Sequence, residues 1–165
     1  MTQTQREEQF MGRALELAAL AAQEGEVPVG AVVVRDGKIL AEGYNRREQD
    51  KNATAHAELL AIDAACKALG GWRLFDCDLY VTLEPCPMCA GAIVNSRIRR
   101  VVYAAKDPKA GCCGSVVDLF CLPFNHRPEV VGGLRAEEAA SLLRSFFADL
   151  RRRGGSGWKK REEQL

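Results

Sequence analysis

Two short runs of metal-binding residues place the strongest constraint on how this chain folds. The first is His56-Ala57-Glu58, and the second is Pro85-Cys86-Pro87-Met88-Cys89. An imidazole and two thiolates favour zinc, whereas magnesium and calcium prefer oxygen ligands and an iron–sulfur cluster normally requires four cysteines. A fold that uses all three side chains as ligands must therefore bring the first run beside the second.

The number of ligands separates a catalytic zinc site from a structural one. His56, Cys86 and Cys89 leave the fourth tetrahedral position open, which is typical of catalytic zinc, while structural zinc usually has four protein ligands. Glu58 adds a carboxylate that a structural site does not need. The alternative is a structural site that His126 or one of the remaining cysteines completes. We predict one catalytic zinc ion per subunit.

The spacing of these residues predicts their place in secondary structure. The two cysteines are three residues apart, so they share a face of a helix, and the adjacent prolines favour the start of that helix. His56 and Glu58 are two residues apart and would point about 200° from each other within a regular helix. A helix must therefore begin close to His56, with Thr54 or Ala55 near its N-cap.

Hydrolytic deamination is the reaction that this pattern predicts. A histidine, an alanine and a glutamate followed by Pro-Cys-x-x-Cys are typical of zinc-dependent nucleobase deaminases. Zinc with an open position lowers the pKa of a bound water to about 7. Glu58 is then expected to take the water proton, deliver it to a ring nitrogen and help the amine leave as ammonia.

Composition favours one globular domain over residues 1–153, followed by a disordered basic tail over residues 154–165. Of the 165 residues, 47% are hydrophobic and 27% are charged, which is typical of a globular protein. The polar N-terminal run is unlike a signal or transit peptide, and no apolar stretch could span a bilayer. The odd number of cysteines is unlike a disulfide framework. We expect a cytoplasmic protein with no membrane association.

Hydrophobic periodicity and turn residues predict a β-hairpin followed by alternating helices and strands. A mixed sheet with helices on both faces follows from this order. The last helix is expected to bury an apolar face that contains Leu142, Leu143, Phe146, Phe147 and Leu150. The expected helices cover residues 10–25, 54–69, 87–95 and 136–152, and the expected strands cover residues 29–34, 39–44, 78–83, 100–105 and 129–131.

The runs that surround the zinc motif resemble the bacterial tRNA-specific adenosine deaminase family from about Phe10 to Arg153. The matching runs are Glu26 to Val32, Gly43 to Arg46, Thr54 to Glu58, Thr82 to Ala92, Ser96 to Ile98 and Asn125 to Arg127. The resemblance implies a three-layer α/β/α sandwich around a five-stranded mixed sheet, and a homodimer. It also implies that the substrate is the wobble adenosine of a tRNA anticodon stem-loop, which is converted to inosine.

The resemblance further implies roles for residues outside the zinc motif, each with a simpler alternative. Asn45 would hold the base, or it closes a turn. Asp107 would bond a ribose hydroxyl, or it caps its own loop. His126 would contact a flanking nucleotide, or it is a buried, hydrogen-bonded histidine. Arg151 and Arg152 would contact phosphates, or they belong to a solvated helix end.

Two other functions remain open from the sequence. The first is a free-base or nucleoside deaminase, acting on guanine or cytosine, on the same scaffold. The basic final helix and the run Asn125-His126-Arg127 argue against it. The second is a non-catalytic, zinc-stabilised RNA-binding subunit, and the presence of Glu58 argues against that function.

Overall fold

The computed structural model describes residues 1–154, so nearly all of the predicted disordered tail lies outside the described residues. The elements match the predicted order. The helices are α1 (Gln3–Gln23), α2 (Ala57–Leu69), α3 (Pro87–Ser96) and α4 (Ala136–Arg152), with a short 3-10 helix η1 (Leu119–Cys121), and the strands are β1 (Gly30–Arg35), β2 (Lys38–Tyr44), β3 (Cys77–Leu83), β4 (Arg100–Ala105) and β5 (Glu129–Gly132).

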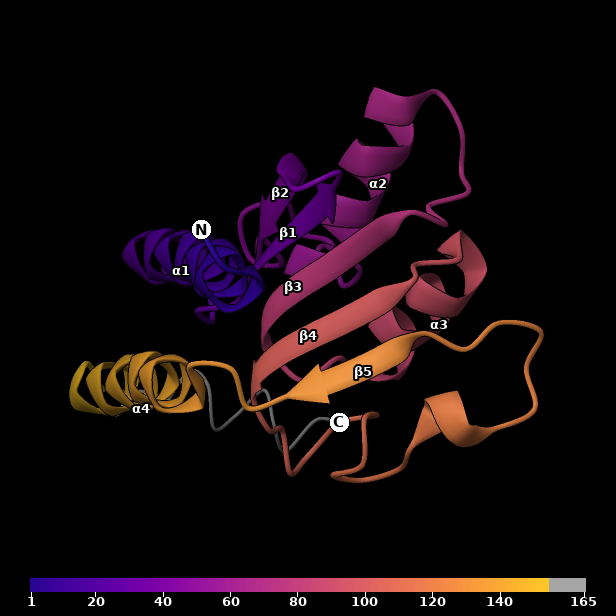
Figure 1. Ribbon diagram of the computed structural model, residues 1–165. Helices are drawn as coiled ribbons and strands as arrows, with labels where there is room; N and C mark the ends of the chain where they lie inside the picture. The colour runs from indigo at the N-terminus through magenta and orange to yellow at the C-terminus, as the bar shows by residue number, and fades with distance from the viewer. Residues whose placement is uncertain (155–165) are drawn as a thin grey trace.

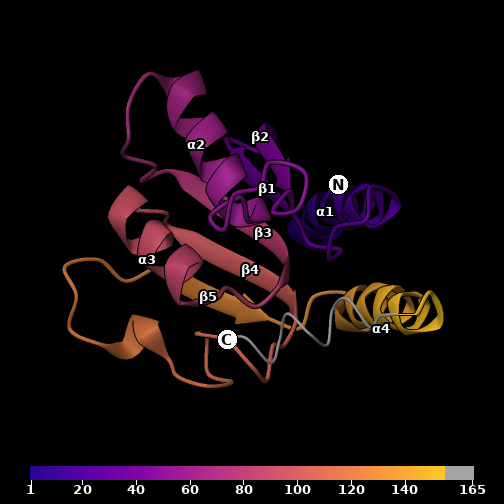
Figure 2. The ribbon, with the colours of Figure 1, turned by 180° about the vertical axis from the view of Figure 1, so that it is seen from behind.

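The strands form one five-stranded mixed sheet in the order β2-β1-β3-β4-β5. Strand β1 is antiparallel to β2 and β3, while β3, β4 and β5 are parallel to one another. Helices α2 and α3 cover one face of the sheet, and α1 and α4 lie on the other (Figure 1 and, from behind, Figure 2). The predicted three-layer α/β/α sandwich is therefore confirmed.

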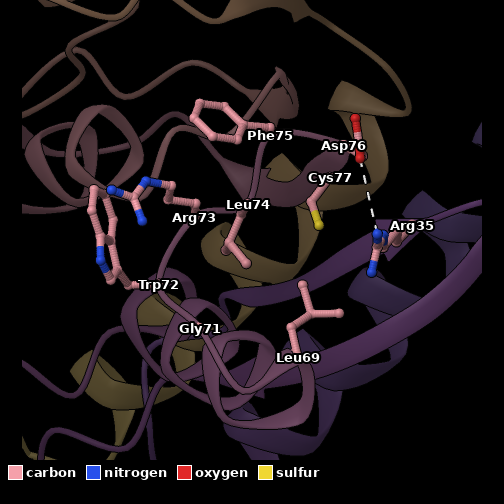
Figure 3. Close-up of a pocket in the computed structure, with 9 residues that line it drawn as sticks. All are labelled: Arg35, Leu69, Gly71, Trp72, Arg73, Leu74, Phe75, Asp76 and Cys77. Atoms are coloured by element: carbon pink, nitrogen blue, oxygen red, sulfur yellow. Dashed lines mark ion pairs between the residues drawn. The ribbon is translucent and has the colours of Figure 1, made fainter.

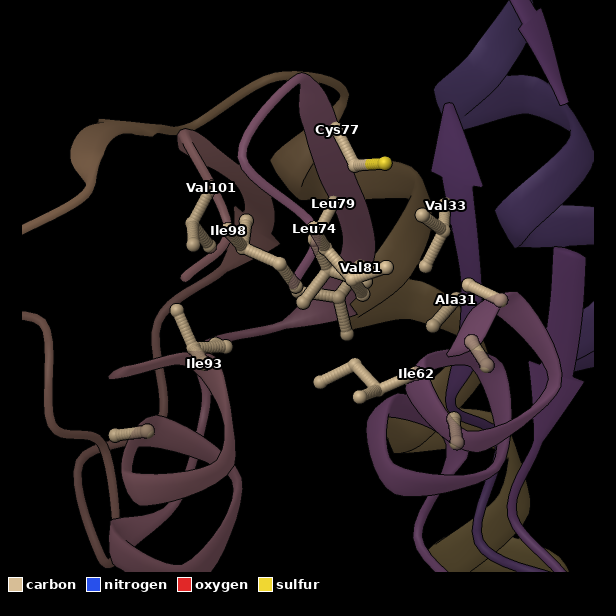
Figure 4. Close-up of a cluster of buried hydrophobic side chains, with 14 of the residues drawn as sticks. Ala31, Val33, Ile62, Leu74, Cys77, Leu79, Val81, Ile93, Ile98 and Val101 are labelled. Atoms are coloured by element: carbon tan, nitrogen blue, oxygen red, sulfur yellow. The ribbon is translucent and has the colours of Figure 1, made fainter. Parts of the chain in front are cut away.

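Alternating strand residues build a separate core on each face of the sheet. Val33, Leu79 and Val81 point toward α2 and α3 and are fully buried there, as Figure 4 shows. Val32 and Val102 belong to the core beneath α1 and α4. Because burial of one such side chain contributes about 1.5–3 kcal/mol, these two cores hold both helical layers against the sheet.

Gly43 sets how closely α2 approaches the sheet. A Cβ atom at Gly43 would lie 2.5 Å from the carbonyl oxygen of Ala57 and 2.8 Å from the nitrogen of Ala61. Real Cβ atoms do not approach backbone atoms so closely, so only glycine allows the first turns of α2 to rest directly on β2. This contact positions the end of α2 that carries Glu58.

The prediction of a buried apolar face along α4 is wrong for most of the helix. Ala139 is its one buried residue, and Phe147 is 36% exposed. Periodicity identifies a common face of a helix but not the element that covers it, and here α4 packs on β4, β3 and α1 mainly through its first half. Among the described helices, none is long and apolar enough to cross a membrane.

Candidate metal centre and active site

The three predicted ligands meet at the edge of the sheet where the parallel strands β3 and β4 end. His56 lies immediately before α2, and the two cysteines lie at the start of α3. The Nδ1 atom of His56 lies 3.6 Å from the Sγ atom of Cys86 and 3.6 Å from that of Cys89. All three ligand atoms fall within 4.8 Å of one another, so one ion can contact all of them.

The start of α2 meets the geometric requirement of the motif. His56 is the N-cap, with extended backbone (φ −77°, ψ 150°), and the helix begins at Ala57. The imidazole therefore leaves the chain before the helical rotation separates it from Glu58. The prediction that Thr54 or Ala55 lies near the cap is confirmed, because Ala55 directly precedes His56. The Thr54 hydroxyl does not cap the helix but donates to Asn52 in the preceding turn.

The start of α3 favours a thiolate on Cys86. Cys86 is the N-cap and Pro87 is the first helical residue, so Cys89 lies in the first turn near the positive end of the helix dipole. Hydrogen bonds with Cys89 and then His56 outweigh burial and lower the pKa of Cys86 to about 4. The hydrogen bond with Cys86, together with burial, raises the pKa of Cys89. A divalent cation stabilises both thiolates at once, so this donor set fits zinc.

Glu58 is a buried carboxyl group beside the ligands. It lies in the first turn of α2 and is 4% exposed. Burial raises the pKa of Glu58 to about 7, against the opposing effect of the nearby His56. A carboxyl group with a pKa in this range can both accept and release protons near neutral pH, as a general acid and base must.

Asn45 follows β2 and lies close to the metal-binding group. It is 6% exposed, and its Nδ2 atom donates to the carbonyl of Val27 at 3.3 Å. The next residue, Arg46, donates its backbone N–H to Ala55, which directly precedes His56. The structure thus brings Asn45 to the same edge of the sheet as the predicted ligands.

Asp107 also lies at this edge, in the loop that follows β4. Its Oδ1 atom accepts from the backbone N–H groups of Lys109 at 3.0 Å and Ala110 at 3.3 Å. These bonds match the simpler alternative, in which Asp107 caps its own loop. They leave the predicted contact with a ribose hydroxyl as a prediction.

His126 and the two predicted arginines do not join this group. Since β4 and β5 are parallel, His126 precedes β5 at the opposite end of the strands, where its Nε2 atom bonds the carbonyl of Ile98 at 2.6 Å. Arg151 and Arg152 are exposed in the last turn of α4, on the other side of the sheet from α2 and α3, and Arg152 pairs with Asp149. Their predicted contacts with RNA stay predictions.

Two buried carboxylates that we did not predict support the loops beside the site. Glu26 is 1% exposed and accepts from the backbone N–H groups of Glu48 and Gln49, in the loop that follows Asn45. Glu84 is 2% exposed and accepts from the loop that follows β4. The available signal was an acidic residue directly next to an apolar β-branched run in both places.

A separate pocket of about 280 Å³ lies at the opposite edge of the sheet, between the end of α2 and the start of β3. Figure 3 shows Trp72 beside Arg73, and the ion pair between Arg35 and Asp76. Trp72 and Phe75 are 50% and 54% exposed there. Because none of the predicted site residues lines this pocket, it is distinct from the metal-binding group.

Comparison with known proteins assigns the site to a family. Residues 4–105 match the family model described as the cytidine and deoxycytidylate deaminase zinc-binding region. The chain is 49% identical over 158 residues to the tRNA-specific adenosine deaminase of Bacillus subtilis, covering 95% of this chain and 98% of the relative. This chain belongs to the tRNA-specific adenosine deaminase family. It is thus a zinc-dependent deaminase that holds one zinc ion per subunit.

Solved structures agree with the family. A structure from a study of A-to-I editing by tRNA:A34 deaminases has a TM-score of 0.80 and 49% identity, covering 82% of this chain and 99% of that one. The guanine deaminase from Nitrosomonas europaea is more distant, with a TM-score of 0.71 and 30% identity over 86% of this chain and 84% of the other. By both sequence identity and TM-score, this chain is more similar to the tRNA:A34 deaminase structure than to that guanine deaminase.

Proposed function

We propose that this deaminase converts the wobble adenosine of a tRNA anticodon stem-loop to inosine. The observation that carries this proposal is the similarity, over nearly the whole length of both chains, to a tRNA-specific adenosine deaminase. The convergence of His56, Cys86 and Cys89 beside the buried Glu58 supplies the machinery that such a reaction needs.

The imidazole of His56 and the thiolates of Cys86 and Cys89 would hold the zinc ion. When bound, zinc supplies Lewis acidity that makes a water molecule available as a nucleophile near neutral pH. The first turns of α2 and α3 fix these three side chains, so the site is organised by the fold and not by mobile loops.

Glu58 moves the protons in the proposed reaction. Its carboxylate accepts a proton from the attacking water and passes it to a ring nitrogen of adenine, while the water oxygen bonds to the amine-bearing carbon. A second proton transfer through Glu58 lets the amine leave as ammonia, and a carbonyl remains. Adenosine and water thus give inosine and ammonia, and Glu58 returns to its starting state.

Asn45 and Asp107 are the proposed contacts to the target nucleotide. Both follow strands that end at the edge where the metal-binding group lies. An amide can pair with adjacent polar atoms on the edge of a purine, so Asn45 is suited to hold the base. Asp107 can accept from a ribose hydroxyl.

The basic end of α4 is the proposed contact to the RNA backbone. Arg151 and Arg152 are exposed in its last turn, and anticodon loops are recognised through splayed bases together with phosphate contacts. His126 precedes β5, at the end of the strands opposite the metal-binding group, so its proposed contact is with a nucleotide that flanks the target and not with the target base.

We also propose that the protein is a homodimer and that it acts in the cytoplasm, where its tRNA substrate is found. The family resemblance supports both statements. Sedimentation velocity of the purified protein should give about twice the 18.1 kDa mass of the chain. A monomer at micromolar concentration would contradict the dimer.

The substrate is tested by incubating the purified protein in parallel with an anticodon stem-loop, guanine and cytosine. Zinc content is measured on the same sample. We expect inosine in the RNA and no ammonia from the free bases. Ammonia from guanine or cytosine without inosine in the RNA would instead support a free-base deaminase, and no reaction from a zinc-loaded sample would support a non-catalytic RNA-binding subunit.

A further inference from the structure

Glu84 is a charged side chain whose burial the proposed reaction does not by itself explain. It follows β3 directly, two residues before Cys86, and is 2% exposed. Its Oε1 atom accepts from the backbone N–H of Asp107 at 3.2 Å and from the hydroxyl of Ser115. Its Oε2 atom accepts from the backbone N–H groups of Cys113 at 2.9 Å and Ser115 at 3.2 Å.

All of these donors belong to one segment, residues 106–115, which we name the 106–115 loop. The loop leaves the end of β4 and contacts Glu84 and Pro85, the two residues that directly follow β3. Backbone bonds tie this part of the chain to the residues around Glu84. The N–H of Glu84 donates to Ala105, which directly precedes the loop, at 2.8 Å, and the N–H of Cys112 within the loop donates to Pro85 at 2.9 Å. The loop therefore lies against the residues that lead into Cys86.

The Glu84 carboxylate accepts hydrogen bonds from loop N–H groups that do not bond within a helix or a sheet. Buried N–H groups need an acceptor, and an ionised acceptor forms stronger hydrogen bonds than a neutral one. Each Glu84 oxygen serves two donors, so the whole carboxylate is used. Taken together, these bonds outweigh burial and hold the pKa of Glu84 below its usual value.

Gly111 shows how closely the loop fits the carboxylate. A Cβ atom at Gly111 would lie 2.3 Å from the Cδ atom and from the Oε2 atom of Glu84, and 2.5 Å from the carbonyl oxygen of Asp107. Gly111 is not among the residues in the left-handed backbone region. Space beside Glu84, and not backbone conformation, therefore requires glycine at this position.

We propose that Glu84 is a positioning residue for the deamination reaction. Its carboxylate fixes the 106–115 loop beside the metal-binding group, so that Asp107 and the loop backbone are already in place when the nucleotide binds. This inference rests on the proposed function. A loop that is already ordered strengthens substrate binding, because no conformational entropy of the loop is lost when the nucleotide binds.

The substitution Glu84→Gln tests the positioning role of the carboxylate without changing the size of the side chain. Gln has one amide oxygen and one NH₂ group, and the NH₂ group cannot accept from the two donors that face it. We expect the KM for an anticodon stem-loop to rise about tenfold, kcat to change less than about threefold, and zinc content to be unchanged. A smaller effect is expected for Ser115→Ala, which removes only the hydroxyl donor.

Two glycine variants provide a second way to disturb the contact between the 106–115 loop and Glu84, together with a matched control. Gly111→Ala forces the loop and the carboxylate apart, so its KM should rise as that of Glu84→Gln does. Gly71→Ala adds the same methyl group where nothing lies within 4 Å, at the opposite edge of the sheet, and should leave KM and kcat unchanged. An unchanged KM in both Glu84→Gln and Gly111→Ala would overturn the proposal, as would a loss of zinc in Glu84→Gln that accounts for its lost activity.

Amide hydrogen exchange separates this inference from the proposed function, since it needs no substrate. Exchange in the 106–115 loop should be faster in Glu84→Gln than in the unmodified protein, while exchange in β3 and β4 should be unchanged. Equal exchange in the loop would overturn the positioning role. Faster exchange in a protein that never converts the stem-loop would refute the proposed function and leave the anchoring of the loop by Glu84 standing.

Discussion

At the scale of single residues, Glu58 is buried beside three metal-binding side chains, and this burial lowers the stability of the folded protein. Taking a carboxylate out of water is unfavourable, and burial raises the pKa of Glu58 to about 7. Alanine at this position in the first turn of α2 would pack without that cost. The carboxyl group is therefore best explained by proton transfer during catalysis.

The first prediction concerns the role of Glu58. Glu58→Gln keeps the size of the side chain but removes its ability to accept a proton, so deamination of the stem-loop should fall by about 10²–10⁴-fold. Zinc content and thermal unfolding should be nearly unchanged, since the side chain is not needed as a ligand. Single-turnover assays with metal analysis check both points, and undiminished deamination would exclude the proton-transfer role.

The spacing of the motif predicted the donor set and the start of α2, because both follow from local helix geometry. His56 could not share the site with Glu58 unless the helix began there, and the structure confirms that it does. The partners of Glu84 and Glu26 could not be predicted. Each carboxylate accepts from N–H groups more than twenty residues away in sequence, and such pairs leave no periodic pattern.

At the scale of elements, the close packing of α2 on β2 determines where His56 and Glu58 lie. Only a glycine at position 43 allows α2 to pack so closely on β2, because the backbone of α2 occupies the space that a side chain at this position would fill. The sequence predicted both elements but not their separation. Distances between elements depend on tertiary packing, which the hydrophobic pattern of a single segment does not record.

The second prediction follows from this packing. Gly43→Ala should push the first turns of α2 away from β2, lower the stability by about 1–3 kcal/mol and reduce activity, because the displaced helix carries Glu58. Thermal unfolding and the stem-loop assay measure the two effects. The control is Gly71→Ala, which meets no atom within 4 Å. Equal melting temperatures for the two variants would contradict the packing argument.

Helix α4 shows the limit of prediction from periodicity at this scale. Its apolar residues do share one face, but most of that face remains partly exposed. The helix is held at its first half, and its last turn carries Arg151 and Arg152 away from the two cores. The pattern predicted the helix correctly and its surroundings incorrectly, because burial depends on the neighbouring elements.

At the scale of the whole molecule, the sheet separates the catalytic layer from the layer that carries the basic helix end. The metal-binding group lies where β3 and β4 end, next to α2 and α3, while α4 lies on the other face (Figures 1 and 2). The net charge is only +1, so the protein as a whole does not attract RNA strongly. The proposed contacts with phosphates therefore depend on the arginines at the end of α4.

The third prediction concerns these contacts. Replacing Arg151 and Arg152 together by alanine should weaken stem-loop binding and reduce the salt dependence of the dissociation constant by about one unit of slope for each lost phosphate contact. The value of kcat should stay the same, since neither arginine lies near the metal-binding group. Binding titrations at several salt concentrations measure the slope, and an unchanged slope would place the RNA elsewhere.

The central claim is zinc-dependent deamination of one adenosine in a folded RNA. It is tested most directly by nucleoside analysis of an anticodon stem-loop that carries adenosine at the wobble position and at a neighbouring loop position. We predict inosine at the wobble position only, its loss when a chelator removes zinc, and its return when zinc is restored. A zinc-loaded protein that forms no inosine, or forms it equally at both positions, would contradict the account.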